Sequence, residues 1–271
     1  MQYREIIPSS LLKPYVKSIY IYESFANKTF TDTVFPSGCV EIVFNLGQGT
    51  WQTWNDADYI SNPNVELWGQ ITNPLKIKSI GNHCMLGVRF YPHAAAFFLD
   101  DKIDLFNNVV IDFQDFLGKE ARVLYAMLQD NDSWQYRIAL VESFLLKRLS
   151  SLQKKTGKVE IVGGVMNELT KQDFFDNIEN VASRYGVSSR YLQKLFLEYS
   201  GLTPKQYSKI NRFQNSLRLM AQSKKSLTAI AYACGYFDQS HFIREFKSFT
   251  GSTPSDYILD PASINVAFAN N

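Results

Sequence analysis

The chain has 271 residues and a formal net charge of +2; 45% of its residues are hydrophobic and 20% charged, the composition of a soluble globular protein with at least one sizeable core. No run approaches the roughly 18 consecutive apolar residues of a membrane helix, and the first residues lack the apolar core of a secretory signal. Cys39, Cys84 and Cys234 lie far apart without a C-x-x-C spacing, which favours reduced thiols in the cytoplasm over a disulfide framework or a zinc finger.

Short β-rich runs alternate with turn signals over the first hundred residues. The clearest runs are 15–22, 40–44 and 85–90, and turn residues cluster between them at 45–49, 61–64 and 73–74. This spacing predicts a compact antiparallel sheet or barrel. After Pro92, the alanine-rich stretch 93–99 has high helix propensity, so we expect a helix to begin there.

Two charged residues, Glu41 and Arg89, stand inside the apolar strand-like runs. If they face a barrel interior, they are candidates for a ligand pocket. A salt-bridged pair and a surface-facing pair are the alternatives. The soft metal ligands in this region are His83, Cys84 and His93, for which we expect ordinary structural roles, and we predict neither a metal nor a cofactor.

From about Asp112 the apolar residues recur with a helical period. The first segment carries Val123, Leu124, Met127 and Leu128, and the next carries Ile138, Val141, Leu145, Leu149 and Leu152. We expect two packed helices. The stripe on the second fits either an intramolecular core or a dimerisation seam, and its short length favours the core. A further short helix is expected over 162–170.

Residues 178–257 contain two copies of one unit. Four residues recur at an offset of 49: Ile178, Val181, Ala182 and Gly186 return as Leu227, Ile230, Ala231 and Gly235. After a one-residue insertion the offset is 50: Leu192, Phe196, Tyr199, Gly201, Thr203, Pro204 and Tyr207 return as Phe242, Phe246, Phe249, Gly251, Thr253, Pro254 and Tyr257. Two copies are too few for a solenoid, so the repeat predicts two small helical modules.

Each copy has the pattern of a helix, a turn and a second helix. Gly186 and Gly235 follow the first helix, where a left-handed residue is favoured. Ser188 or Ser189 in the first copy, and Asp238 in the second, offer N-cap oxygens for the second helix. Two helices joined by so short a turn form the helix-turn-helix motif, whose second helix enters the DNA major groove.

The second helix of each copy has an apolar face and a polar face at about 100° per residue. The apolar faces carry Leu192, Leu195, Phe196 and Tyr199 in the first copy and Phe242, Phe246 and Phe249 in the second. The polar faces carry Arg190, Gln193 and Lys194 in the first, and Ser240, Arg244 and Lys247, flanked by Gln239, His241 and Ile243, in the second. A basic helix face is often only a solvated surface, but its recurrence in both copies favours contacts with base edges and phosphates.

Charge and helix length agree with this interpretation. Residues 1–172 hold 17 Lys and Arg against 18 Asp and Glu, whereas residues 173–271 hold 11 against 8. The helix expected between the two copies, 204–221, spans about 27 Å. Because one turn of B-DNA is roughly 34 Å long, this length allows two recognition helices in successive major grooves.

The chain resembles the AraC/XylS type of bacterial transcription regulators over residues 175–257, most specifically at 235–247 and 251–254. The resemblance implies DNA contacts on both recognition helices, at Ser189, Arg190, Gln193, Lys194, Gln239, Ser240, His241, Arg244 and, on a phosphate, Lys247. More weakly, residues 35–45 and 86–92 resemble the companion domains of one branch of this family. Such domains are cupin-like and are taken to sense a small molecule or to mediate dimerisation.

These observations predict an α+β protein. We expect a β-rich, cupin-like sensing domain over 1–110, a helical linker or dimerisation region over 111–172, an all-α double helix-turn-helix domain over 173–260 and a tail over 261–271. The expected function is sequence-specific transcription regulation; the partners are promoter or operator DNA, a small-molecule effector, a second copy of the chain and, for an activator, RNA polymerase. No membrane partner is expected.

The main alternative is a β-rich ligand-binding or enzymatic protein whose helical repeat binds another protein. The sequence has no G-x-G-x-x-G, Walker A, G-x-S-x-G or H-E-x-x-H motif, and it has only three histidines. We therefore expect no enzymatic activity.

Overall fold

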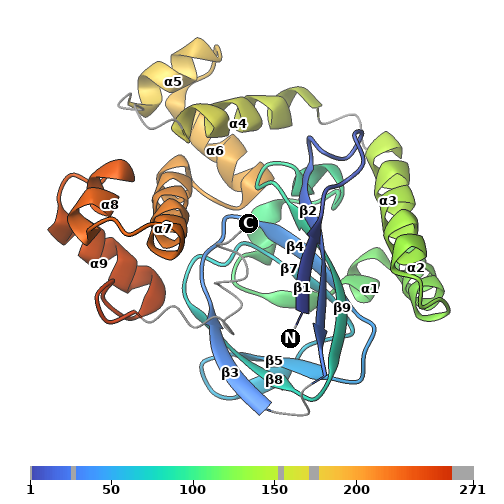
Figure 1. Ribbon diagram of the computed structural model, residues 1–271. Coiled ribbons are helices and arrows are strands. Elements are labelled where there is room, and N and C mark those ends of the chain that lie inside the picture. Colours follow the sequence, from blue (N-terminus) through green and yellow to red (C-terminus); the bar gives the residue numbers. More distant parts are fainter. Residues whose placement is uncertain (1, 26–28, 152–155, 171–176, 258–271) are drawn as a thin grey trace.

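The computed structural model describes residues 2–25, 29–151, 156–170 and 177–257. Two antiparallel sheets form the N-terminal part, and the helices that follow lie to the right, at the top and to the left of the sheets in Figure 1. None of the helices in the described ranges has the length and hydropathy needed to cross a membrane. The expected tail, 261–271, and the expected boundary between residues 172 and 173 lie outside the described residues.

The larger sheet has the strand order β1-β2-β9-β4-β7-β10 and the smaller sheet β3-β8-β5-β6. The strands of the larger sheet are β1 Gln2–Ile6, β2 Val16–Ser24, β9 His83–Phe90, β4 Val40–Asn45, β7 Val65–Trp68 and β10 Val110–Asp112. Those of the smaller sheet are β3 Thr29–Val34, β8 Leu75–Ile80, β5 Thr50–Trp54 and β6 Tyr59–Ser61. The predicted antiparallel architecture is confirmed, and the three clearest predicted runs are the adjacent strands β2, β9 and β4.

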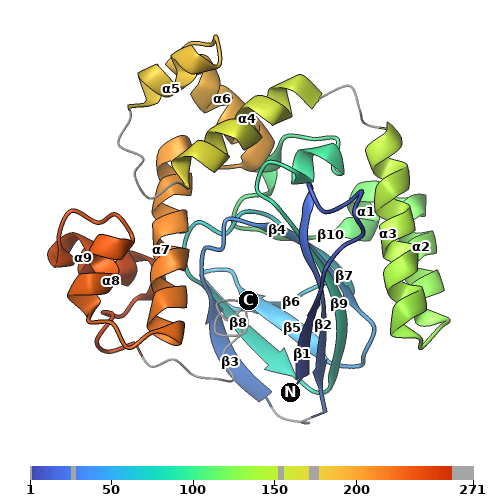
Figure 2. The same ribbon diagram turned by 45° about the horizontal axis from the view of Figure 1, so that its top comes forward.

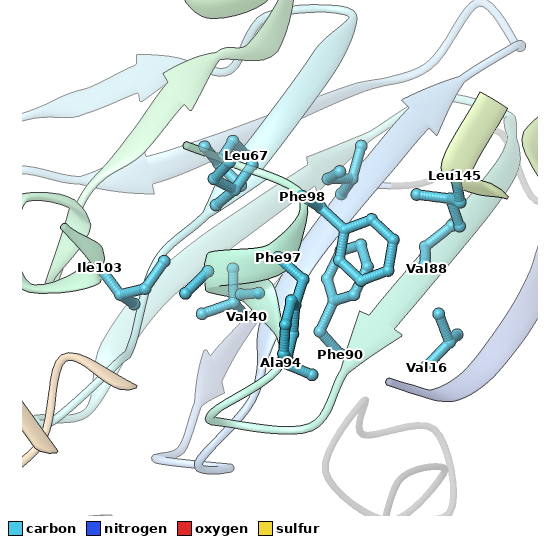
Figure 3. Packing of buried hydrophobic residues seen from close by; sticks show 14 of the residues in the cluster. Val16, Val40, Leu67, Val88, Phe90, Ala94, Phe97, Phe98, Ile103 and Leu145 are labelled. Atoms are coloured by element: carbon cyan, nitrogen blue, oxygen red, sulfur yellow. The ribbon is translucent and has the colours of Figure 1, made fainter. Parts of the chain in front are cut away.

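Both faces of the larger sheet are buried, because alternate residues of a strand point to opposite sides. Tyr20, Tyr22, Val43 and Met85 pack against Trp51 and Ile77 of the smaller sheet. The alternate residues, among them Val40, Val88 and Phe90, pack beneath Phe97, Phe98 and Leu145 (Figure 3). The first face encloses a cavity and the second forms the main hydrophobic core.

The helix expected after Pro92 is absent from the structure. Only a short 3₁₀ turn forms there, η1 Ala95–Phe97, followed by a second, η2 Ile103–Phe106. Ala94, Ala95 and Ala96 are fully buried, and the Phe98 ring lies on Phe90 with ring centroids 4.9 Å apart. Packing on all sides of this segment thus overrides its helix propensity, which is a weak local preference.

The helical region after residue 112 consists of α1 Phe113–Leu117, α2 Lys119–Gln129, α3 Trp134–Ser151 and α4 Thr156–Leu169. Val141 and Leu145 of α3 lie in the main core, so the expected stripe packs within the chain; Leu152 lies outside the described residues. On α2 the expected stripe is partly wrong. Val123 and Met127 are exposed, and Ala121 and Tyr125 are buried beside Leu124 and Leu128.

The last five helices are α5 Ile178–Arg184, α6 Ser189–Ser200, α7 Pro204–Gln222, α8 Leu227–Ala233 and α9 Gln239–Thr250. The α5–α6 pair packs against α4 and η2, whereas α8 and α9 pack against α7. In Figure 2, α7 has the α8–α9 pair on its left, the sheets on its right and the α5–α6 pair above it. Four residues of α6 belong to the same hydrophobic cluster as the larger sheet: Leu192, Leu195, Phe196 and Tyr199.

Candidate nucleic-acid interface

The two helix-turn-helix units are built by the same local devices. Gly186 and Gly235 have φ of +67° and +76°, the left-handed region expected between the two helices. The Ser188 hydroxyl accepts a hydrogen bond from the Tyr191 backbone N–H at 3.2 Å. The Asp238 carboxylate accepts one from the His241 backbone N–H at 2.6 Å. Both second helices therefore begin where the sequence predicts.

Helix α6 presents the expected polar face. Leu192, Leu195, Phe196 and Tyr199 are buried on one side of it. Arg190, Gln193 and Lys194 are exposed on the other side, and Ser189, the first residue of the helix, is partly exposed. Tyr191 and Leu197 are also exposed, at 38% and 39%, and the sequence reasoning did not single them out as surface residues. The exposed surface of α6 therefore combines hydrogen-bond donors with apolar side chains.

Helix α9 presents a narrower face than the sequence suggested. Ser240, Arg244 and Lys247 are exposed, opposite the buried phenylalanines. Gln239 is half-buried, and its side-chain oxygen accepts a hydrogen bond from the Thr228 hydroxyl at 2.8 Å. The half-buried His241 ring meets the Tyr236 ring edge-on, with centroids 5.3 Å apart.

Helix α7 connects the units and anchors the second one. It begins with a capping box between Thr203 and Gln206, with Pro204 at its first position. In the middle of α7, the Arg212 guanidinium contacts both carboxylate oxygens of Glu245 on α9, at 3.2 and 3.3 Å. Because Glu245 is only 6% exposed, this ion pair fixes α9 against α7.

A basic groove of about 820 Å³ runs along α7 and reaches the α8–α9 turn and His241. Five cationic residues line it: Lys205, Lys209, Arg212, Arg218 and Lys225. No carboxylate of the described residues belongs to its lining. The sequence reasoning missed this groove, although Lys205, Lys209 and Arg212 recur at the spacing of one helix face.

The structure brings the two candidate ligand residues of the β-rich part together. The Arg89 Nε donates a hydrogen bond to Glu41 Oε1 at 2.8 Å, and the Tyr20 hydroxyl donates one to Glu41 Oε2 at 2.9 Å. Glu41 also lines the cavity between the sheets. The salt-bridged alternative therefore describes the pair, while only the carboxylate partner borders the cavity.

The three candidate metal ligands, His83, Cys84 and His93, have separate structural surroundings. The ring of the buried His83 lies 2.6 Å from the Ser79 hydroxyl and 5.2 Å, centroid to centroid, from Trp51. His93 lies under Gly163 of α4, where an added Cβ would be 3.0 Å from its ring. Burial lowers the pKa of each histidine to about 4. Cys84 is half-buried, and burial raises its thiol pKa.

Two family models match separate parts of the chain. Residues 181–259 match a helix-turn-helix domain, and residues 4–112 match a domain of unknown function. The transcriptional activator RhaS of Escherichia coli is 30% identical over 121 residues, which cover 44% of each chain. RhaS of Pectobacterium carotovorum is 29% identical over 105 residues, 39% of this chain and 37% of the relative. The chain thus matches less than half the length of these curated relatives.

The chain is also similar to solved structures. ToxT of Vibrio cholerae is 15% identical and has a TM-score of 0.46, with 88% of this chain and 96% of that chain covered. The DNA-binding domain of AdpA, in complex with a target DNA, is 26% identical and has a TM-score of 0.32, with 36% and 86% covered.

Proposed function

Because the C-terminal part of this chain is a helix-turn-helix domain of the AraC/XylS type, we propose that the protein is a transcription regulator that binds double-stranded DNA through α6 and α9. The observation that carries the proposal is that the helix-turn-helix unit occurs twice, with an exposed cationic face on the second helix of each copy. The curated relatives are transcriptional activators by name, which supports the same function. Catalysis has no part in the proposal.

The exposed side chains divide by the DNA groups that they suit. Arg190 and Arg244 offer paired donors for guanine O6 and N7, and Gln193 suits adenine. Lys194 and Lys247 suit phosphates or base edges near the groove wall. Ser189, Ser240, Gln239 and His241 complete the proposed set at the starts of the two helices.

The basic groove along α7 supplies a second kind of contact. We assign Lys205, Lys209, Arg218 and Lys225 to phosphate binding, because lysine and arginine charges on a polar groove neutralise phosphates without regard to sequence. Arg212 is held by Glu245 and contributes mainly to the position of α9. The groove would therefore raise affinity, while α6 and α9 would select the site.

Regulation by a small molecule is supported by one segment shared between the two parts of the chain. Val34, Ser37 and Cys39 line the cavity between the sheets. Phe35, between them, belongs to the hydrophobic cluster of α7 and α9. The Pro36 carbonyl accepts a hydrogen bond from the Gln214 side chain of α7 at 2.6 Å. A ligand that moved this segment would act directly on the second helix-turn-helix unit.

A second copy of the chain and, for an activator, RNA polymerase are further proposed partners. The α3 stripe packs within the chain, so a dimer would have to use another surface. Sedimentation of the full chain with and without DNA tests the dimer, and reporter transcription with purified polymerase tests activation.

The DNA-binding proposal is tested on the full chain with a site selected from a random-sequence DNA pool. Arg190→Ala and Arg244→Ala should each weaken specific binding about 10- to 100-fold, since a bidentate base contact contributes roughly 1–3 kcal/mol. Lys119→Ala, an exposed lysine on α2 away from both units, is the matched control and should bind like the wild type. Failure to select any site, or equal binding by all variants, would favour the protein-interaction alternative.

A further inference from the structure

The cavity between the two sheets is small, and aromatic side chains form part of its wall. Its volume is about 70 Å³. One water needs roughly 10–15 Å³ of such space, so the cavity has room for about five waters or one compact ligand. Five aromatic side chains contribute to its wall: Tyr3, Tyr20, Tyr22, Trp51 and Trp68. Because ring faces carry negative potential, this wall favours a cation over an anion of the same size.

Glu66 of β7 is an acidic group in this wall that is almost completely buried, with an exposed fraction of 2%. Its Oε2 accepts hydrogen bonds from the Trp68 indole N–H and, at 2.9 Å, from the Asn62 side-chain amide. No described residue donates a hydrogen bond to its Oε1. A buried carboxylate oxygen without a donor is costly, so this oxygen is suited to receive one from a ligand.

The charges around the cavity are unbalanced. Glu41 and Glu66 both line it, and no Lys, Arg or His of the described ranges does. The charge of Glu41 is compensated from outside the cavity by the buried Arg89, whereas no cation of the described residues forms an ion pair with Glu66. Burial raises the pKa of Glu66 to about 7, so the carboxylate is charged above that pH. There, an anionic ligand would meet two carboxylates, and a neutral one would leave the Glu66 charge uncompensated.

We propose that the cavity binds a compact ammonium cation, which donates an N–H hydrogen bond to Glu66 Oε1 and lies among the aromatic rings. The ligand class follows from three observations together: the bare oxygen of a buried carboxylate, the absence of a cation from the described lining, and the ring-lined wall. The role of this cation as an effector rests on the proposed function, but its binding does not.

The binding test uses isothermal titration calorimetry on the full chain with three probes of matched size: isobutylammonium, isobutanol and isobutyrate. Isobutylammonium should bind saturably with one site, and isobutanol and isobutyrate at least tenfold more weakly. Equal or tighter binding of the alcohol or the carboxylate would overturn the proposal. This comparison is made on the wild-type protein, so it does not depend on the folding of a variant.

Glu66→Gln, which keeps the shape of the side chain and removes its charge, should weaken isobutylammonium binding at least tenfold and leave isobutanol unchanged. Glu160→Gln removes an exposed carboxylate from α4 and should change neither. Unchanged ammonium binding in a folded Glu66→Gln protein would also overturn the proposal. Parallel titrations of the selected DNA separate the two proposals: ammonium binding without any change in DNA affinity keeps the site and rejects its effector role.

Discussion

The Phe35 ring, which follows β3, meets the Phe213 ring of α7 nearly edge-on, with ring centroids 6.0 Å apart and planes at 72°. Phe35 is 6% exposed, and the Tyr257 ring also lies near it, with centroids 5.8 Å apart. It therefore joins the β-rich part to the hydrophobic cluster of the second helix-turn-helix unit. Val34 before it and Ser37 after it line the cavity, so the proposed link between a bound ligand and the position of α7 passes through this contact.

Phe35→Ala should lower the free energy of unfolding by about 3 kcal/mol, because it removes a buried ring and leaves a void against Phe213. It should also abolish any effect of a bound ligand on DNA affinity while leaving ligand binding itself intact. Urea denaturation and paired DNA and ligand titrations measure both. Ile60→Ala, at an exposed position on β6, is the control. Ligand-dependent DNA binding that survives in Phe35→Ala would contradict the proposed linkage.

Gln193→Ala and Gln239→Ala form a matched pair on the two recognition helices. Gln193 is exposed on α6, whereas the Gln239 side chain is bonded to Thr228. Gln193→Ala should therefore cost roughly 1–3 kcal/mol of discrimination at one base pair. Gln239→Ala should change base preference less and mainly remove a link between α8 and α9. Competition binding against single-base variants of the selected site measures the loss of specificity in each variant. Equal losses would show that the Gln239 side chain breaks its hydrogen bond to Thr228 and contacts a base.

The double variant Lys205→Ala/Lys209→Ala tests the basic groove. Each lost phosphate contact should reduce the slope of log affinity against log salt by about one, while the ranking of DNA sequences stays the same. Binding measured by fluorescence anisotropy over a salt series gives this slope. The exposed Lys119 provides the single-site control. A changed sequence ranking with an unchanged slope would assign these lysines to base recognition instead.

Burial raises the pKa of Glu66 from 4.5 to about 7, which predicts a stability change with pH. Below pH 4.5 the proton is bound in both the folded and the unfolded state. Between pH 4.5 and 7 the unfolded state loses its proton first, so the free energy of unfolding falls by a total of about 3 kcal/mol. The other acidic groups around it, Asp112 opposite on β10 and Glu41 on β4, are present in both proteins compared.

Glu66→Gln should lack this decrease, so its stability relative to the wild type should rise from pH 5 to pH 8. Urea denaturation at each pH gives the difference, and contributions from all other titrating groups largely cancel. Parallel pH profiles of the two proteins would show that Glu66 is ionised at its ordinary pKa.

Gly87→Ala should distort the cavity wall. A Cβ at this position would lie 2.0 Å from the ring of Tyr20, which packs over the glycine on the neighbouring strand. The ring must move, at a cost of about 1–3 kcal/mol, and isobutylammonium binding should weaken. Gly157→Ala in α4, where an added Cβ meets nothing within 4 Å, should leave stability unchanged or slightly raised. Equal stability of the two variants would contradict this account of Tyr20.

The amino-acid sequence by itself determined the two helix-turn-helix units. Their signals are local: a left-handed glycine, an N-cap oxygen and apolar residues three or four positions apart all act within a few residues along the chain. Gly186, Ser188 and Asp238 therefore take the predicted conformations, and the exposed faces of α6 and α9 follow from helix periodicity. Strands β2, β9 and β4 are neighbours in one sheet, and their apolar runs in the sequence predicted them as strands.

The tertiary structure decided what depends on contacts between distant residues. The 93–99 segment has helix propensity but packs as a 3₁₀ turn under the larger sheet. Glu66 is one acid in an apolar strand, and only the pairing of β7 within the sheet and the facing sheet make it a cavity residue. The contact between Phe35 and Phe213 joins residues far apart in the chain. Such packing is set by the summed burial of many side chains, whereas caps and periodicity are set within one or two helical turns.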